Sequence, residues 1–495
     1  MKARNVRRGF RRWLPPYIIP PRMPRHDIIA IGGGTAGLVT AAGAAGLGAR
    51  VALVEADRLG GECLWTGCVP SKALVASARA AHAARHASTL GVDVGEVVPD
   101  GPRIFEWIRA AQRRIAPHDS PERFRSLGVE VVTGTARFTG AHEISVDGRR
   151  LEARHIVIAT GTRPIVPDIP GLADVAFLTN GSVFALDRLP RRLLILGAGV
   201  VGLEMAQAFA RLGSDVQLLE ASATLLPGED AELVAQLASC LEREGVKVAL
   251  GARVTRARRE GDEVVLDAEI GGARTEQRGD TLLVAAGRRG HIEELELAVP
   301  GVATANGVVS VDDRLRTNVP GVWGAGDAIG GLRFTHVADY EARLVVRNAL
   351  FPFGTGRDYR VVPWVIFTDP ELAHVGLTER EARERHGDGV RVWRRPFDDL
   401  DRAVVDGQTA GMVKLITTRG GRLLGAHVLG YGAGNMIGEL ALAMKHGLGA
   451  AQLSATIHAY PTYPEAIKQA ADAWYRSRLT GLTKSLVKRL VSRAE

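Results

Sequence analysis

Residues 27–37, "DIIAIGGGTAG", place three glycines at the GxGxxG spacing directly after a short apolar run. Gly32 permits a tight turn, Gly34 lets a pyrophosphate approach the backbone, and Gly37 lets a helix pack closely on a strand. An Ala- and Gly-rich segment then predicts the helix, and the strand "ARVALVE" ends in Glu55. That acid falls about 20 residues on, where a carboxylate can bind a ribose diol. The stretch therefore predicts a βαβ dinucleotide-binding unit.

The same pattern occurs a second time at residues 192–222, "RLLILGAGVVGLEMAQAFARLGSDVQLLEAS". Its glycines are Gly197, Gly199 and Gly202, and its acid is Glu220. Two such units predict two dinucleotides, and a flavin with a nicotinamide is a natural pair because hydride from the second reduces the first. Glu220 would bond the free 2′-hydroxyl of NADH and repel the 2′-phosphate of NADPH. The sequence thus favours NAD.

Two of only three cysteines in the 495 residues, Cys63 and Cys68, lie close together in "GGECLWTGCVP". A disulfide needs Cα atoms within about 7 Å. On a regular helix, residues five apart are separated by about 7.5 Å along the axis and face different ways. A bond between these cysteines therefore requires a distorted backbone. The glycines that can supply the distortion are Gly60, Gly61 and Gly67.

Three interpretations of the cysteine pair were weighed. A metal site needs further Cys or His ligands, and none lies nearby in the sequence, so no metal site is expected. A disulfide with only a structural role would close a very short loop and would constrain little of the unfolded chain. A dithiol that cycles between open and closed forms is the preferred interpretation.

Four motifs together resemble a known family. They are "GGECLWTGCVPSKAL", "ATGTRP" (159–164), "GVWGAGDA" (321–328) and "VIFTDPELAHVGLTE" (365–379). Over about residues 25–475 the chain is similar to the FAD-dependent pyridine nucleotide–disulfide oxidoreductases, which include dihydrolipoyl dehydrogenase, glutathione reductase and mercuric reductase. The resemblance implies an oxidoreductase with FAD and NAD as cofactors. It also implies a homodimer with an active site shared across subunits.

The implied fold class is α/β, with two Rossmann-like βαβ domains, for FAD and NAD, and a C-terminal α+β dimerisation domain. The predicted boundaries are a basic tail (1–24), a first FAD-binding segment (25–165), an NAD-binding domain (166–288), a second FAD-binding or central segment (289–357), a dimerisation domain (358–475) and a basic amphipathic tail (476–495).

The resemblance also implies roles for individual residues. Cys68 is expected to face the flavin as the charge-transfer thiolate, and Cys63 to meet the substrate as the interchange thiol. Lys72 and Glu204 are expected to pair beside flavin N5, where an ammonium favours negative charge on the reduced ring. The remaining predicted cofactor-binding residues are Ala136, Thr160, Gly161, Gly287 and, on the ribityl chain, Asp327.

The substrate side departs from the family. Thiol-reducing members have His-Pro followed by a Glu, whereas "HAYPTYPEAIKQAAD" (458–472) places Tyr460 at the histidine position, with Glu465 after it. His458 lies two residues earlier. A tyrosine with a pKa near 10 is a poor base at about pH 7. This departure speaks against an efficient glutathione or lipoamide enzyme.

Several activities consequently remain open. Electrons could pass between Cys63–Cys68 and a dithiol or disulfide, as in dihydrolipoyl dehydrogenase, in either direction. A mercuric or metal-ion reductase is an alternative, although mercuric reductases carry a further cysteine pair that this chain lacks. A quinone-reducing diaphorase and a transhydrogenase-like enzyme are others, and a non-catalytic subunit fits the intact motifs worst.

Composition sets the remaining expectations. Three cysteines cannot form a disulfide framework, which indicates a reducing, cytoplasmic location. Seven basic residues between positions 2 and 22 supply most of the net charge of +8. The body is therefore nearly neutral, and no nucleic-acid partner is expected. The third cysteine, Cys240, is interpreted as a small buried hydrophobe.

Leucines at helical spacing alternate with basic residues in "RSRLTGLTKSLVKRLVSRAE" (476–495). This pattern predicts a basic amphipathic helix. Packing on its own domain and peripheral contact with an anionic membrane are both open interpretations.

Overall fold

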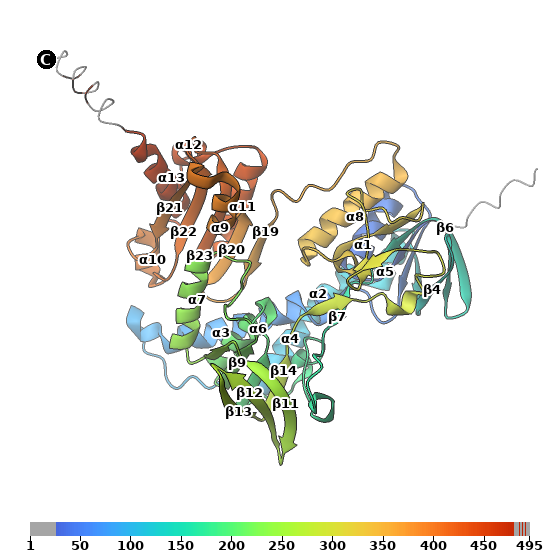
Figure 1. Ribbon diagram of the computed structural model, residues 1–495, viewed down its shortest axis with the longest axis horizontal. Coiled ribbons are helices and arrows are strands. Elements are labelled where there is room, and N and C mark those ends of the chain that lie inside the picture. Colours follow the sequence, from blue (N-terminus) through green and yellow to red (C-terminus); the bar gives the residue numbers. More distant parts are fainter. Residues whose placement is uncertain (1–25, 480–484, 486–487, 489–490, 492–495) are drawn as a thin grey trace, which may run out of the picture.

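The computed structural model describes residues 26–479 and, beyond them, residues 485, 488 and 491. Figure 1 shows three bodies: one of blue, teal and gold segments, one that is largely green, and one that runs from orange to red. No helix in this described part is both long and apolar enough to cross a membrane. The predicted tail at residues 1–24 lies outside the described residues, as does most of the tail at 476–495, so both predictions stay untested.

The first glycine motif opens a parallel sheet. Strand β1 (His26–Ile31), helix α1 (Thr35–Gly46) and strand β2 (Val51–Glu55) form the βαβ unit. β1 pairs in parallel with β2 on one side and with β6 (Arg149–Ile158) on the other. The glycine turn therefore lies at the carboxyl end of a central strand. The sheet follows the order β3-β2-β1-β6-β5-β4, with β3 (Glu130–Thr133), β4 (Ala136–Gly140) and β5 (Glu143–Val146) as its other members.

A segment from much later in the chain completes this body. β18 (Val322–Gly324) pairs in parallel with β6, and α8 (Thr335–Leu350) packs on α1. The gold α8 lies beside the blue α1 in Figure 1. The crossing to and from the second body is marked by the antiparallel pair β7 (Thr162–Pro164) and β15 (Arg288–Gly290). A further small ribbon joins β16 (Thr304–Ala305) to β17 (Val308–Val309).

The second glycine motif builds the second body in the same way. β8 (Arg192–Leu196), α6 (Val200–Arg211) and β9 (Asp215–Glu220) form a parallel βαβ unit. Their sheet has the order β10-β9-β8-β14. The remaining elements are α7 (Ala231–Arg243), β10 (Lys247–Leu250), β14 (Thr281–Val284) and the antiparallel strands β11 (Arg253–Glu260), β12 (Glu263–Ile270) and β13 (Ala273–Gly279).

The third body is an antiparallel sheet covered by helices. The order of its strands is β19-β20-β23-β22-β21. Its strands are β19 (Pro363–Ile366), β20 (Glu371–Gly376), β21 (Val390–Pro396), β22 (Met412–Thr418) and β23 (Leu423–Gly430). Its helices are α9 (Glu379–His386), α10 (Asp401–Asp406), α11 (Ala433–Lys445), α12 (Ala450–Ala455) and α13 (Glu465–Ser477).

The helix that follows the cysteines joins the first two bodies. α2 (Gly61–Trp65) and α3 (Cys68–Arg85) carry the pair, and the buried Leu74 of α3 shares one apolar core with Phe209 of α6. The neighbouring helices are α4 (Gly101–Ile115) and α5 (Pro121–Ser126). The α/β class with two Rossmann-like sheets and a C-terminal α+β body, expected from the sequence, is confirmed.

Candidate active site

The helical segment that carries the cysteine pair is broken between the two residues. α2 ends at Trp65, Gly67 has φ −130° and ψ −114°, and α3 begins at Cys68. This break supplies the backbone distortion that the spacing of the cysteines requires. Cys63 and Cys68 are both free thiols in this structure.

Two glycines in left-handed conformations allow this segment to pack against the glycine-rich turn of the first βαβ unit. Gly60 has φ +103° and Gly61 has φ +55°, values that other residues rarely adopt. A Cβ at Gly61 would lie 2.5 Å from the Cα of Gly34, so no larger residue fits there. The cysteine pair is thus held against the glycine-rich turn of the first body.

The two thiols have opposite acidities. A hydrogen bond from Cys63, with help from the Thr335 hydroxyl and the Lys72 charge, lowers the pKa of Cys68 to about 6. The Thr335 Oγ1 lies 3.4 Å from the Cys68 sulfur. The same bond to Cys68, together with burial, raises the pKa of Cys63. Cys68 is also the first residue of α3, where a helix N-terminus favours an anion. The geometry therefore makes Cys68 the thiolate of the pair at neutral pH.

Lys72 and Glu204 meet beside this thiolate. The Lys72 ammonium lies 3.1 and 2.8 Å from the two carboxylate oxygens of Glu204, which is buried. A Glu204 oxygen also accepts a bond from the backbone N–H of Phe367 at 3.0 Å, and Lys72 lies 4.6 Å from the Phe367 ring centroid. Lys72 lies on α3, Glu204 in the second body and Phe367 in the third, so their contacts hold α3 against these two bodies beside the sulfur pair.

The first glycine turn fits the predicted flavin dinucleotide. A Cβ at Gly37 would lie 1.8 Å from the Gly32 carbonyl oxygen, whereas nothing approaches a Cβ at Gly34 within 3.9 Å. The close packing and the open approach that the motif requires are therefore both present. Glu55 accepts a bond from the N–H of Gly33, at the start of the turn.

A cavity beside this turn is lined by Gly32, Glu55, Ala136 and Thr160, all predicted cofactor-binding residues. The hydroxyl of Thr160 is buried and has no hydrogen-bond partner in the part of the chain that the structure describes. A buried hydroxyl without a partner is costly, so a polar ligand group at this point would relieve it. These residues fit the ribose half of an FAD, which when bound would relay the two electrons of a hydride.

The predicted flavin site continues to the point where β18 and the residues after it rejoin the first sheet beside β6. Asp327 accepts a bond from the Thr162 hydroxyl at 3.1 Å. Gly161 adopts φ +70° and leaves open space where a Cβ would point. The structure thus places Asp327 next to Thr162 of the "ATGTRP" motif, and its role on the ribityl chain stays a prediction.

The second glycine turn repeats the first. A Cβ at Gly202 would lie 2.0 Å from the Gly197 carbonyl oxygen, and Gly199 is open. The Glu220 carboxylate accepts bonds from the N–H groups of Ala198 and Ser222, both at 2.7 Å. These residues fit the pyrophosphate and ribose of a nicotinamide dinucleotide. Gly287, at φ +115°, lies at the crossing between the two bodies, where its carbonyl accepts from the Ile165 N–H at 2.9 Å.

A cluster around Glu62 was missed from the sequence. Its carboxylate accepts bonds from Asn180 and Arg288. Burial raises the pKa of Glu62 despite the Arg288 charge. Arg288 also donates to the Thr162 hydroxyl at 2.9 Å. Glu62 directly precedes Cys63, so its position in "GGEC" was the available signal, and the partners could only be found from the fold.

The predicted base region lies apart from the sulfur pair within one chain. The Tyr460 side chain is 71% exposed, and its hydroxyl donates to Asp401 at 2.7 Å. That bond raises the pKa of Tyr460. His458 lies 3.0 Å from Glu439, and Glu465 accepts from Gln469. These three predicted residues therefore make their hydrogen bonds inside the third body.

The third cysteine lies elsewhere. Cys240 is buried in α7, and its sulfur accepts a bond from the Arg243 guanidinium at 3.1 Å. Burial raises its pKa, which makes the thiol unreactive at neutral pH.

Comparisons with known proteins give a consistent result. A family model described as pyridine nucleotide-disulphide oxidoreductase matches residues 26–342, and the dimerisation-domain model of that family matches residues 362–471. A mercuric reductase of Streptomyces lividans is 38% identical over 457 residues, which cover 91% of this chain and 96% of that protein. A dihydrolipoyl dehydrogenase of Thermus scotoductus is 36% identical over 467 residues, covering 92% and 99%.

A solved structure is similar over nearly the whole chain. The Cu(II) complex of the HOCl-induced flavoprotein disulfide reductase RclA from Escherichia coli superposes with a TM-score of 0.82 at 30% identity. The match covers 91% of this chain and 100% of that one.

Proposed function

The chain belongs to the pyridine nucleotide–disulphide oxidoreductases, and from that premise we propose that it is an NADH-dependent reductase of thiophilic metal ions. The matches confirm the predicted flavoprotein oxidoreductase with FAD and a nicotinamide dinucleotide as cofactors. The dimerisation domain supports a homodimer. The nature of the acceptor and the choice of NADH are the proposed steps.

One observation carries the proposal: at the position where the family resemblance implies a histidine base, this chain has Tyr460, whose hydroxyl is bound to Asp401. Exchange with a disulfide substrate needs a base that holds the proton of the departing thiol. The raised pKa of Tyr460 makes it unsuitable for this task at neutral pH. A metal ion needs no such base, because it displaces the thiol proton when it binds.

The sulfur pair suits a soft metal ion. Cys68 is a thiolate at neutral pH, and thiolates select soft ions such as Hg(II) and copper. Hg(II) takes two electrons from the dithiol, which yields Hg(0), two protons and the Cys63–Cys68 disulfide. NADH and one proton then return the disulfide to the dithiol, so the sum is NADH and Hg(II) giving NAD⁺, H⁺ and Hg(0).

Two relatives support this class of acceptor. One is named a mercuric reductase and one was solved as a Cu(II) complex. The dihydrolipoyl dehydrogenases at comparable identity keep a second candidate open. That candidate rests on His458, whose imidazole is paired with Glu439 only two residues before Tyr460. If His458 serves as the base, dihydrolipoamide is oxidised by NAD⁺ efficiently.

The test is anaerobic NADH oxidation with HgCl₂, CuCl₂, lipoamide and glutathione disulfide as separate acceptors. The expected result is a metal-dependent rate that exceeds the rates with both disulfides. Cys63→Ser and Cys68→Ser should abolish it, and Cys240→Ser is the matched control that should keep it. Faster turnover of lipoamide than of either metal would instead establish the second candidate.

We further propose a reducing, cytoplasmic location, which the small number of cysteines, three in 495 residues, supports. The domain boundaries given by the sequence remain proposals of the same kind. Membrane contact through the C-terminal tail falls outside the described residues.

A further inference from the structure

The junction between the second and third bodies contains a row of basic side chains. His374 of β20 pairs with His427 of β23, and His427 pairs with Lys414 of β22, as direct neighbours across three strands. All three side chains are buried. The start of α7 with the loop before it faces this row, as Figure 1 shows for α7 and β23.

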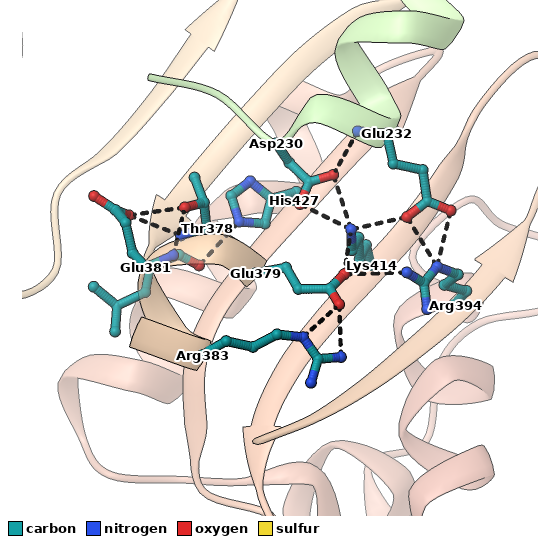
Figure 2. Close-up of polar contacts among 10 residues, drawn as sticks. Asp230, Glu232, Thr378, Glu379, Glu381, Arg383, Arg394, Lys414 and His427 are labelled. Atoms are coloured by element: carbon teal, nitrogen blue, oxygen red, sulfur yellow. Dashed lines mark hydrogen bonds and ion pairs between the residues drawn. The ribbon is translucent and has the colours of Figure 1, made fainter. Parts of the chain in front are cut away.

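The outer two members of the row have acidic partners from that segment. The Lys414 ammonium lies 2.8 Å from Asp230 and from Glu232, and His374 Nδ1 lies 2.8 Å from a Glu229 oxygen. Figure 2 shows Lys414 surrounded by the carboxylates of Asp230, Glu232 and Glu379, with His427 alongside. The Lys414 charge is thereby balanced, and His374 Nδ1 has a carboxylate partner.

The middle member, His427, has no acidic partner. Its Nε2 lies 3.1 Å from the Leu377 carbonyl oxygen and so donates to it, which leaves Nδ1 with a free lone pair. That Nδ1 is buried and has no hydrogen-bond partner among the described residues, and the residue is fully buried. A buried acceptor without a donor is costly, and it requires an explanation.

His374 is anchored in the same way. Its Nε2 lies 2.8 Å from the Gly376 carbonyl oxygen and donates to it, which leaves Nδ1 to face Glu229. Anchoring one ring nitrogen on a carbonyl while the other faces the site is the usual arrangement of metal-bound histidines. Glu229 is itself fixed by the Trp364 indole N–H at 2.6 Å.

One ring nitrogen of each histidine and one carboxylate oxygen of Glu229 lie within 4.8 Å of one another. We propose that Glu229, His374 and His427 form a site for a divalent transition-metal ion of the zinc type, which fastens the second body to the third. Two imidazoles and one carboxylate are a donor set that such ions accept. No metal site is expected from the sequence, because the three ligands are spread over 199 positions of the chain.

The neighbouring lysine does not prevent cation binding. Its charge is balanced by Asp230, Glu232 and Glu379, which all lie 2.8 Å from its nitrogen. The ion would lie between His374 Nδ1 and Glu229, and the free Nδ1 of His427 would become its third ligand.

The experiment uses the full-length flavoprotein carrying Cys63→Ser and Cys68→Ser, so that the thiols cannot bind the probe. After treatment with a chelator, Zn²⁺ is titrated by calorimetry. Bound zinc is then counted by elemental analysis after gel filtration. One zinc per chain and a higher unfolding temperature with zinc are expected.

His427→Ala and Glu229→Gln test the ligands, and His446→Gln, an exposed histidine of the same body, is the control. Changes to outer residues of metal sites already cost about 10–100-fold in affinity, so loss of a ligand should cost at least roughly 100-fold. Should His427→Ala fail to bind FAD, Glu229→Gln decides, because it keeps size and shape. The proposal would be overturned if the protein with Cys63→Ser and Cys68→Ser binds no zinc. It would also be overturned if the ligand variants bind zinc as tightly as the His446→Gln control.

Discussion

Two lysines, Lys72 and Lys414, each meet acidic side chains of the second body, yet the two junctions are built differently. The Lys72 side chain is 36% exposed and faces one carboxylate, that of Glu204. The Lys414 side chain is 3% exposed and faces three carboxylates. Although burial opposes it, hydrogen bonds to these acids raise the pKa of Lys414.

The difference separates a structural charge from a functional one. The Lys414 charge is balanced by three carboxylates, so its role is limited to holding the second and third bodies together. The Lys72 charge extends beyond its single acid, because it also lowers the pKa of Cys68. A lysine with incomplete compensation, open on one side, can act on a ligand or a reacting sulfur.

The largest expected effect is on stability at the buried junction. Lys414→Met leaves three carboxylates without their cation, and breaking such a buried pair costs about 3–5 kcal/mol. Urea unfolding of the FAD-bound protein measures the change. Lys445→Met is the control: this lysine is 49% exposed and pairs with Asp358, so its loss should cost under about 1 kcal/mol. Similar losses in both variants would remove the distinction between the junctions.

Lys72→Met should instead impair the reaction while stability changes little. Loss of one preorganised electrostatic group costs on the order of 10²–10³-fold in turnover. The Cys68 thiolate forms as pH rises through a pKa of about 6. Removal of a nearby positive charge raises that pKa, so the pH profile of Cys68 alkylation should move to higher pH.

Cys63→Ala sharpens this test, because the hydrogen bond from Cys63 is the largest influence on Cys68. The variant should move the pH profile of Cys68 alkylation to higher pH by more than Lys72→Met does. An unchanged profile in Lys72→Met, despite slower turnover, would show that Lys72 acts only on the cofactor.

The sequence predicted one junction and not the other for a physical reason. Glycine turns are local patterns, so both βαβ units and the cysteine segment could be predicted from short stretches of the sequence. Lys72 and Glu204 were paired only through the family resemblance. The Lys414 junction depends on the register of three antiparallel strands and on the loop before α7, and no local pattern encodes which side chains become neighbours there. The Glu62–Arg288 contact was missed for the same reason.

Tyr460→His tests whether the third body has lost a base. An imidazole has a pKa near 6.5 and can accept a thiol proton at neutral pH. Activity with lipoamide should rise relative to metal reduction on the order of 10²-fold, the low end for a positioned acid–base group. Tyr460→Phe, which removes only the bond to Asp401, is the control and should bring no such gain. Strong lipoamide turnover by the unmodified enzyme would mean that His458 already serves as the base.

The smallest effect concerns Glu220, an acid that resembles Lys72 in being incompletely paired. Its carboxylate accepts only backbone N–H bonds, from Ala198 and Ser222, and no lysine or arginine of the described chain forms an ion pair with it. Its negative charge therefore remains able to repel a 2′-phosphate.

The enzyme should prefer NADH over NADPH by at least about tenfold in kcat/KM, the scale of one 1.4 kcal/mol interaction. Glu220→Gln should narrow that preference by raising kcat/KM for NADPH, whereas Glu242→Gln, an exposed acid on α7, should leave it unchanged. Equal use of both nucleotides by the unmodified enzyme would show that the backbone bonds already hold the carboxylate away from the 2′-position.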